Sequence, residues 1–207
     1  MLHQCLRQIP VHMLKVGITG GIGSGKTSVC MIFEAIGIPV YYADIQAKLL
    51  MDTDPALKAS LEECFGKDIY HNGLLDRRKM ANIIFNERLA LEKVNSLVHP
   101  AVNCDFEYWC NQQVSSYVLE ESAILFETNM TQRFEKIILV TAPTPLRIER
   151  VCLRDRITAE AVRKRMASQW QEEKKIPLAD YIIYNDNEHF ITPQVRKIHR
   201  QLLLISK

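Results

Sequence analysis

The segment Gly20-Gly21-Ile22-Gly23-Ser24-Gly25-Lys26-Thr27 has the pattern G-x-x-x-x-G-K-T. The six residues before it, 14–19, form a short apolar run that is typical of a buried parallel strand. The nine residues after it, 28–36, carry apolar side chains at helical spacing. This order predicts a strand, a tight loop and a helix, and therefore an α/β fold.

The loop has the residue types that hold a chain of phosphate groups. Backbone N–H groups can surround a phosphate only where no side chain blocks the approach, and glycine has none. The helix behind the loop adds the positive end of its dipole. Lys26 is expected to reach the β- and γ-phosphates of a nucleotide, and the Thr27 hydroxyl is expected to bind Mg²⁺. The expected nucleotide-binding residues are Gly21, Ile22, Gly23, Ser24, Gly25, Lys26, Thr27 and Ser28. The alternative is a glycine-rich turn that only connects a strand to a helix, and the Lys-Thr pair disfavours it.

The composition is that of an ordinary globular protein. Of 207 residues, 47% are hydrophobic and 24% are charged, and the formal net charge of +2 does not suggest a nucleic-acid-binding protein. The six cysteines show neither a C-x-x-C pair nor zinc spacing, which favours reduced cysteines and a cytoplasmic location. No apolar run approaches the length of a membrane span, so we expect no membrane partner. We expect residues 1–13 to be a dispensable N-terminal extension.

The rest of the chain is predicted to form one domain, 14–207, with two excursions from its sheet. The five predicted strands are residues 14–19, 38–42, 117–121, 136–141 and 179–185. The expected core comprises residues 14–51, 117–143 and 179–207, with a helical acceptor-binding subdomain over 52–116 and a lid over 144–178. The predicted fold class is thus α/β, with a five-stranded parallel sheet flanked by helices.

Two acidic residues stand where strands of this sheet end. Asp44 follows the second strand, and in a doubly wound sheet this edge lines the ligand crevice. Asp44 could therefore accept a proton from a substrate hydroxyl, or it could only cap the next helix, and spacing alone leaves both interpretations open. Glu121 ends the third strand, a position from which an acidic residue can assist Mg²⁺.

The predicted lid is rich in arginine. Arg147, Arg150 and Arg154 recur at helical spacing and share one face, and three further arginines follow at 156, 163 and 165. Guanidinium groups match phosphate oxygens, which favours a lid that covers phosphates and excludes water. The alternative is a surface hairpin held by ion pairs with the interspersed acidic residues.

The block from 52 to 116 is predicted to be helical and to have no strand of its own. Its expected helices begin at Asp54-Pro55 and then span about 76–85, 87–97 and 101–113, with His99-Pro100 opening the last one. A turn is expected at residues 71–73. The simpler interpretation of the basic cluster 77–79 is a solvent-exposed helix face. The simpler interpretation of His99 is a capped turn.

Many short motifs, in order, resemble those of dephospho-CoA kinases from Met13 to the C-terminus. The stretch 19–27 is similar to the T-G-G-I-G-S-G-K-[ST] of that family. The further matches are Ala43-Asp44, Phe65-Gly66, Asn72-Gly73-Leu74-Leu75-Asp76-Arg77, His99-Pro100, Leu125-Phe126-Glu127, Arg150, Arg154-Asp155, Gln169, Ala179-Asp180 and Asn185. The chain differs from the usual family pattern at Tyr42, Ala123 and Glu121.

This resemblance implies a P-loop kinase fold, like that of nucleoside monophosphate kinases, and a specific activity. That activity is transfer of the ATP γ-phosphoryl group to the ribose 3′-hydroxyl of dephospho-CoA, with Mg²⁺, to give coenzyme A. It implies that Asp44 binds and deprotonates the hydroxyl, and that Arg77, His99 and Glu127 lie on the acceptor side. It also implies that Arg154 acts on the phosphates with Lys26, and that Asn185 lies near the adenine. We expect ATP and dephospho-CoA as the partners of a monomer or weak homo-oligomer.

Two other classes share the phosphate loop. A GTP-dependent switch usually carries N-K-x-D and D-x-x-G elements, and we find neither in the sequence. A nucleoside or nucleotide kinase is the nearer alternative, because a fold does not determine the acceptor. A non-catalytic nucleotide-binding protein is disfavoured by the presence of Lys26, Thr27 and Asp44 together.

Overall fold

The computed structural model describes residues 13–128 and 130–206, and within this range the side chains of residues 85, 86 and 88 are not described. Residues 42–112 form one compact unit, and the described residues on either side of them form the other. The predicted extension, residues 1–13, lies outside the described residues except for its last residue. In the part of the chain described here, no helix is both long and apolar enough to cross a membrane.

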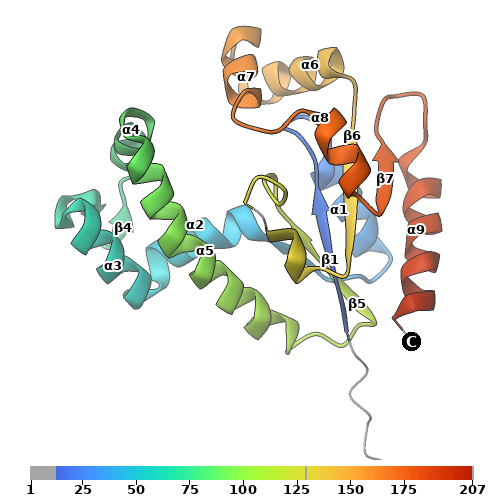
Figure 1. Cartoon of the computed structure of the whole chain (residues 1–207), viewed down its shortest axis with the longest axis horizontal. Helices are drawn as coiled ribbons and strands as arrows, with labels where there is room; N and C mark the ends of the chain where they lie inside the picture. Colours follow the sequence, from blue (N-terminus) through green and yellow to red (C-terminus); the bar gives the residue numbers. More distant parts are fainter. Residues whose placement is uncertain (1–12, 129, 207) are drawn as a thin grey trace, which may run out of the picture. The chain divides into compact units, whose positions relative to one another are not determined.

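The first unit contains the parallel sheet that the sequence predicts (Figure 1). Its strands are β1 (Leu14–Thr19), β2 (Val40–Tyr42), β5 (Tyr117–Glu121), β6 (Lys136–Thr141) and β7 (Tyr181–Tyr184), in the order β2-β5-β1-β6-β7. Strand β1 pairs in parallel with β5 on one side and β6 on the other. Every residue of β5 is buried, including Glu120 and Glu121 at its end, and so are five of the six residues in β6.

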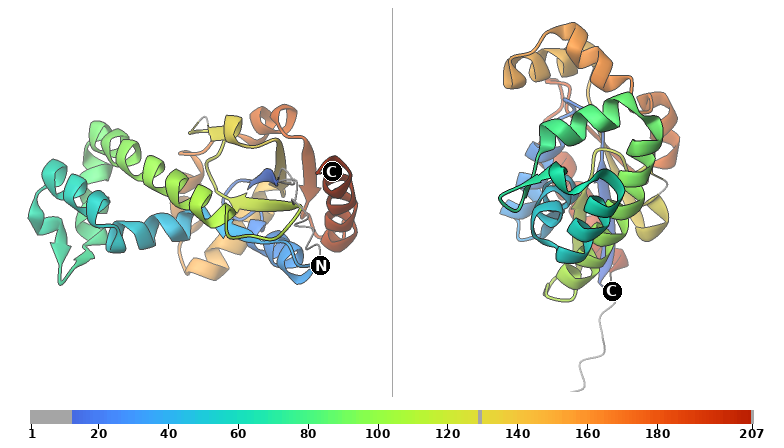
Figure 2. Two further views of the ribbon diagram at one scale, coloured as in Figure 1. Left: turned by 90° about the horizontal axis from the view of Figure 1, so that it is seen from below. Right: turned by 90° about the vertical axis from the view of Figure 1, so that its left-hand side faces the viewer.

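The helices of this unit follow the strands in the expected order. They are α1 (Lys26–Ala35), α6 (Thr144–Asp155), α7 (Ala159–Met166), α8 (Glu172–Lys175) and α9 (Ile191–Ile205). Helix α1 ends where Gly37 adopts a φ of 86° and donates its N–H to the Glu34 carbonyl, a left-handed terminus that favours glycine. Helix α9 packs against α1 through the buried side chains of Val195, Ile198 and Leu202 (Figure 2).

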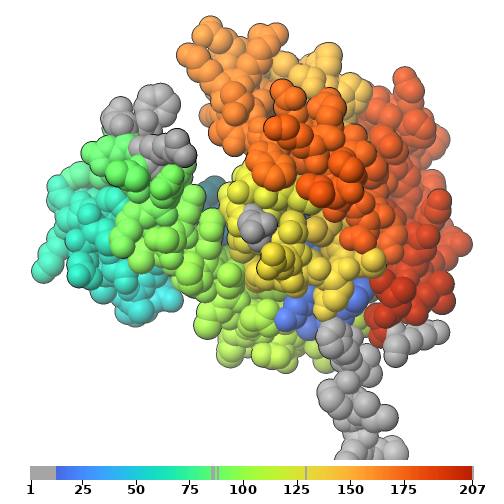
Figure 3. Space-filling view, in the orientation of Figure 1, coloured from blue at the N-terminus to red at the C-terminus, as the bar shows by residue number. Residues whose placement is uncertain are grey.

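The predicted lid contains the three helices α6, α7 and α8. Thr158 caps α7 by accepting a hydrogen bond from the Ala161 N–H at 3.3 Å. Helix α7 stops at Met166, and residues 167–171 lead into α8. In the space-filling view, the segment from α7 to α8, in orange, forms a continuous part of the surface of this unit (Figure 3).

The second unit is mainly helical. It contains α2 (Ala43–Thr53), α3 (Pro55–Phe65), α4 (Arg77–Asn86) and α5 (Arg88–Cys110), with a short 3₁₀ turn at Lys67–Ile69. Asp54 caps α3 through the N–H groups of Ala56 and Leu57, with Pro55 in the first turn, as predicted. Helix α5 packs against α2, α3 and α4, so it is the centre of this unit.

Two predictions for this unit are wrong. It does contain strands, because β3 (Tyr70–His71) and β4 (Leu74–Leu75) form an antiparallel hairpin around Asn72 and Gly73. Both turn residues have positive φ, 52° and 81°, which is the two-residue hairpin turn that Asn-Gly favours.

The second error concerns Pro100. It does not open a helix but lies inside α5, which runs without interruption for 23 residues. An interior proline removes one backbone hydrogen bond and is unfavourable. Here the packing of α5 against three other helices offsets that cost.

Candidate active site

The phosphate loop lies between β1 and α1, as the sequence predicts. The Lys26 ammonium group donates a hydrogen bond to the Gly20 carbonyl at 3.1 Å, and it lies 3.6 Å from a carboxylate oxygen of Glu121. Both side chains are only about one-tenth exposed. The lysine at the start of α1 and the carboxylate at the end of β5 therefore meet beside the loop.

The glycines of the loop have a steric role that the motif alone does not reveal. A Cβ atom on Gly21 would lie 2.0 Å from the Nη2 atom of Arg147, and one on Gly25 would lie 2.0 Å from the Nδ2 atom of Asn185. Gly23 and Gly25 also have positive φ, 80° and 89°. These positions thus require glycine because protein side chains pack directly on the loop.

Arg147 is the first of these side chains. It comes from the first turn of α6 and is 5% exposed. Its Nε–H donates to the Ile22 carbonyl at 2.9 Å, and its Nη1–H donates to Glu172 on α8 at 2.7 Å. Burial lowers the pKa of the Arg147 guanidinium, and the Glu172 carboxylate opposes that shift. The Thr141 hydroxyl donates a hydrogen bond to the second oxygen of Glu172.

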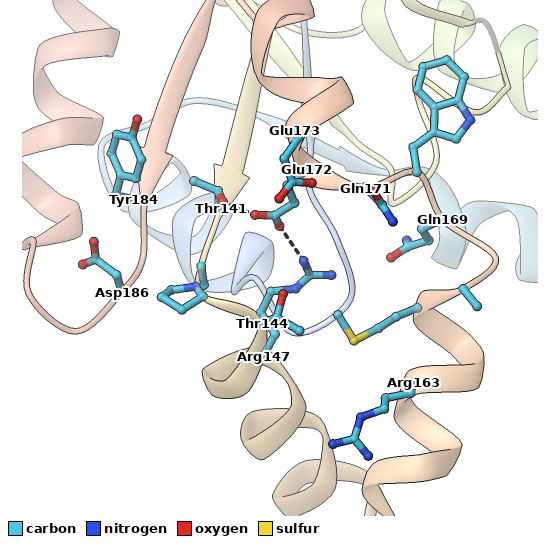
Figure 4. Close-up of a pocket in the computed structure, with 15 residues that line it drawn as sticks. Thr141, Thr144, Arg147, Arg163, Gln169, Gln171, Glu172, Glu173, Tyr184 and Asp186 are labelled. Atoms are coloured by element: carbon cyan, nitrogen blue, oxygen red, sulfur yellow. Dashed lines mark hydrogen bonds and ion pairs between the residues drawn. The ribbon is translucent and has the colours of Figure 1, made fainter.

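A cavity of about 840 Å³ lies beside this ion pair (Figure 4). In Figure 4, Arg147 and Glu172 point toward each other from α6 and α8. The walls come from the end of β6, the lid helices and the residues around the end of β7. The cavity is lined by Thr141, Ala142, Pro143, Thr144, Arg147, Arg163, Met166, Ala167, Gln169, Trp170, Gln171, Glu172, Glu173, Tyr184 and Asp186.

Gln169 and Asn185 also hold the phosphate loop. The Gln169 side-chain oxygen accepts the Ile22 N–H at 2.8 Å, and its amide donates to the Ala123 carbonyl at 3.1 Å. The Asn185 amide, just after β7, donates to the Ser24 carbonyl at 2.8 Å. The side chains of Arg147, Gln169 and Asn185, which come from three separate segments of the chain, thus hold the backbone of the phosphate loop.

Arg150 and Arg154 lie in different surroundings although both were expected on one lid face. Arg150 donates to the Asn185 carbonyl at 3.0 Å and to the Asn187 side chain at 2.9 Å. Arg154 instead pairs with Asp155 at 2.7 Å, and its side chain is 63% exposed. The alternative interpretation of an ion-paired surface therefore describes Arg154 in this structure, whereas Arg147 and Arg150 face the loops.

Glu127 joins the segment after β5 to the end of the lid. One of its oxygens accepts the Trp170 N–H at 2.8 Å and lies 2.6 Å from the Lys175 ammonium group. Lys175 is completely buried.

The remaining candidate residues lie in the second unit. Asp44 is exposed in the first turn of α2, and the N-cap position is filled by Tyr42, so Asp44 is not the helix cap. Arg77 forms an ion pair with Asp52 and donates to the Lys48 carbonyl at 3.2 Å. Because residues 44, 48 and 52 are spaced by four, they lie on one face of α2. Arg77 is therefore docked on the face that carries Asp44, about 12 Å along the helix axis. His99 lies half-buried on α5, which packs against α2.

Comparison with known proteins identifies the family. A family model described as dephospho-CoA kinase matches residues 14–190. The dephospho-CoA kinase of Porphyromonas gingivalis is 41% identical over 187 residues, which cover 90% of this chain and 93% of that protein. The chain belongs to the dephospho-CoA kinase family.

Solved structures agree with this fold. The crystal structure of TT1252 from Thermus thermophilus superposes with a TM-score of 0.81 at 28% identity, covering 94% of this chain and 98% of that one. A shikimate kinase from Acinetobacter baumannii in complex with shikimate matches with a TM-score of 0.54 at 14% identity, covering 94% of this chain and 95% of that one. This second likeness shows the fold alone, because a fold does not determine the acceptor.

In this member of the dephospho-CoA kinase family, two buried residues, one on the phosphate loop and one at the end of the lid, were not among the expected site residues. Arg147 was recognised only as part of an arginine face, and Lys175 was not singled out. The glycine at position 21 was a usable signal for Arg147, because the phosphate motif itself does not require glycine there. Lys175 stands in the charged run Glu172–Lys175, a pattern typical of a solvated surface, so nothing local indicated its burial.

Proposed function

We propose that this chain transfers the γ-phosphoryl group of ATP to the ribose 3′-hydroxyl of dephospho-CoA and so produces coenzyme A. The observation that carries the proposal is the match of residues 14–190 to the dephospho-CoA kinase family. It is supported by the loop in which the Lys26 ammonium group is held between the Gly20 carbonyl and Glu121. Such a site supplies backbone donors and a cation to a phosphate chain.

The phosphate loop and the lid would stabilise the transferring group. Phosphoryl transfer requires little covalent chemistry from the protein, so positioning and charge compensation account for most of the catalysis. Lys26 would interact with the β- and γ-phosphates, and Arg154, exposed in this structure, would approach the phosphates from the lid. Asn185, which bonds to Ser24 in the loop, would lie at the adenine side.

Asp44 is proposed to bind the acceptor hydroxyl and to take up its proton. Its exposed carboxylate in the first turn of α2 is accessible to a substrate. A general base must come within about 3 Å of the proton that it accepts. Arg77, His99 and Glu127 would bind the rest of dephospho-CoA.

The residues present also fit Mg²⁺. Thr27 offers a hydroxyl in the exposed first turn of α1, and Glu121 offers a carboxylate beside Lys26. Hydroxyl and carboxylate oxygens are the ligands that Mg²⁺ prefers. When bound, the metal would offset the negative charge of the phosphates.

We also propose that the protein works in the reducing cytoplasm, because none of the five described cysteines forms a disulfide. As a separate proposal, the protein is a monomer or a weak homo-oligomer.

The Asp44→Asn variant tests the catalytic assignment. It removes the proton acceptor but keeps the size of the side chain, so ATP should bind as in the wild type while turnover falls by about 100-fold or more. Calorimetry gives the ATP affinity, and release of ADP gives the turnover. Glu63→Gln, the same kind of change on the exposed surface of α3, is the matched control. Near-normal turnover of Asp44→Asn would show that Asp44 is not the base.

A further inference from the structure

The phosphate loop contains a tight turn whose central peptide group can point in two directions. The Ser24 N–H donates to the Gly21 carbonyl at 3.1 Å, so residues 21–24 form a β-turn with Ile22 and Gly23 in the middle. Gly23 has a φ of 80°, whereas φ of Ile22 is not positive. This combination is the signature of a type II turn, which differs from type I in the direction of the central peptide.

Arg147 holds that central peptide. Its Nε–H donates to the Ile22 carbonyl at 2.9 Å. No peptide bond between described residues is cis, so the Gly23 N–H points opposite to the Ile22 carbonyl and away from the guanidinium group. If the Ile22–Gly23 peptide were flipped, the Gly23 N–H would point toward the positively charged guanidinium group of Arg147. The buried Nε–H of Arg147 would then have no acceptor, which is unfavourable.

Contacts with the lid keep Arg147 in this position. Its Nη1–H donates to Glu172 at 2.7 Å, and the Thr141 hydroxyl donates to the same carboxylate. The preceding peptide is fixed as well, because the Ile22 N–H donates to Gln169 at 2.8 Å. The guanidinium group is almost completely buried, so displacing it would break several hydrogen bonds at once.

We propose that Arg147 is a positioning residue that directs the Gly23 N–H toward the phosphate chain of ATP, and that Glu172 orients Arg147 for this task. Backbone N–H groups are the phosphate donors of a G-x-x-x-x-G-K-T loop, so their directions must be set before the nucleotide arrives. The inference rests on the proposed use of ATP at this loop. Arg147 acts through the Ile22–Gly23 peptide and does not itself contact the reacting atoms. Because it belongs to the first turn of α6, it also links nucleotide affinity to the lid.

The Arg147→Lys variant tests this role, because it keeps the positive charge but loses the planar set of donors. We expect the dissociation constant of ATP, measured by calorimetry without acceptor, to rise about tenfold, as for loss of one well-placed hydrogen bond. The KM for ATP should rise similarly, and the KM for dephospho-CoA should not change. Glu172→Ala should act in the same direction.

Two comparisons separate positioning from a general loss of structure. The double variant Arg147→Lys/Glu172→Ala should be no worse than Arg147→Lys alone, because both changes remove the same support. Glu172→Gln keeps an oxygen acceptor for Arg147, so its ATP affinity should stay within about twofold of the wild type. Glu173→Gln removes one charge from the same cavity without breaking that bond, and it serves as the matched control.

A folded Arg147→Lys protein with wild-type ATP affinity would overturn the inference, as would equal increases in the KM for both substrates. If Arg147→Lys does not fold, as judged by its thermal midpoint, the Glu172→Ala variant decides by the same criterion. The ATP measurement needs no acceptor. A wild-type protein that binds ATP but does not phosphorylate dephospho-CoA would therefore contradict the proposed function and leave this test valid.

Discussion

Lys175 and Glu127 form an ion pair with 2.6 Å between the ammonium nitrogen and a carboxylate oxygen, and the lysine is completely buried. The same carboxylate oxygen accepts the backbone N–H of Trp170. One acidic side chain after β5 therefore holds Trp170, just before α8, and Lys175, the last residue of α8. This contact gives the lid a fixed attachment to the core of its unit.

Breaking this pair should destabilise the protein. Lys175→Met leaves the Glu127 carboxylate in a confined site without its cation, and we expect the free energy of unfolding to fall by about 3 kcal/mol. Urea denaturation followed by circular dichroism measures the change. The double variant Lys175→Met/Glu127→Gln should recover part of the loss, because it removes the uncompensated charge. Wild-type stability of Lys175→Met would mean that the pair contributes little.

Asn185 should matter for nucleotide binding because its amide donates to the Ser24 carbonyl at 2.8 Å. Asn185→Asp replaces that donor with an acceptor and adds a negative charge next to the phosphate loop. We expect the KM for ATP to rise at least tenfold, with a smaller effect on the KM for dephospho-CoA. Steady-state kinetics with each substrate varied in turn measures both values. An unchanged KM for ATP would exclude this role.

The proposed metal site predicts a specific dependence on Mg²⁺. Glu121→Gln keeps the shape of the side chain but removes the charge beside Lys26. The Mg²⁺ concentration for half-maximal activity should then rise about tenfold, as for weakened metal sites in general. Titration of activity with MgCl₂ at saturating ATP gives this value. If the Mg²⁺ titration curves of the wild type and of Glu121→Gln coincide, Glu121 does not assist the metal.

His199 predicts how stability depends on pH. Its Nδ1 atom lies 2.7 Å from the Tyr117 hydroxyl, and burial lowers the pKa of His199 below its ordinary value of 6.5. Below that value the unfolded chain binds a proton that the folded protein resists, so unfolding becomes more favourable as the pH falls. The stabilisation is thus present above about pH 6.5 and is lost toward lower pH.

The variant His199→Gln isolates this effect. It has no titrating group at this position, so its melting temperature should fall less than that of the wild type between pH 7.5 and 5.5. Differential scanning calorimetry at the two pH values measures the difference. If the melting temperatures of the wild type and of His199→Gln fall equally between pH 7.5 and 5.5, other groups cause the pH dependence.

Local sequence signals predicted much of the fold. Strands β5 and β6 have the bounds that were predicted, and α3 begins at the expected Asp54-Pro55. These features depend on neighbouring residues, so the sequence alone contains them. The family motifs then predicted the kinase activity.

Features that depend on tertiary contacts were not predictable. Pro100 is a helix breaker by local rules, yet α5 continues through it because the helix packs on three others. The hairpin at residues 70–75 was too short to be distinguished from a turn. Lys175 looked like a surface residue, and its partner Glu127 is distant in the sequence. The contacts of Arg147 with Ile22 and Glu172 likewise join three separate segments.

The acceptor is the central claim, and one assay tests it most directly. The wild-type protein is incubated with ATP, MgCl₂ and either dephospho-CoA or a panel of nucleosides and nucleoside monophosphates, and ADP release is followed. Nuclear magnetic resonance of the product identifies the phosphorylated position. We predict turnover with dephospho-CoA and a product phosphorylated at the ribose 3′-hydroxyl. Turnover confined to a nucleoside or nucleotide, or a product phosphorylated elsewhere, would contradict the account.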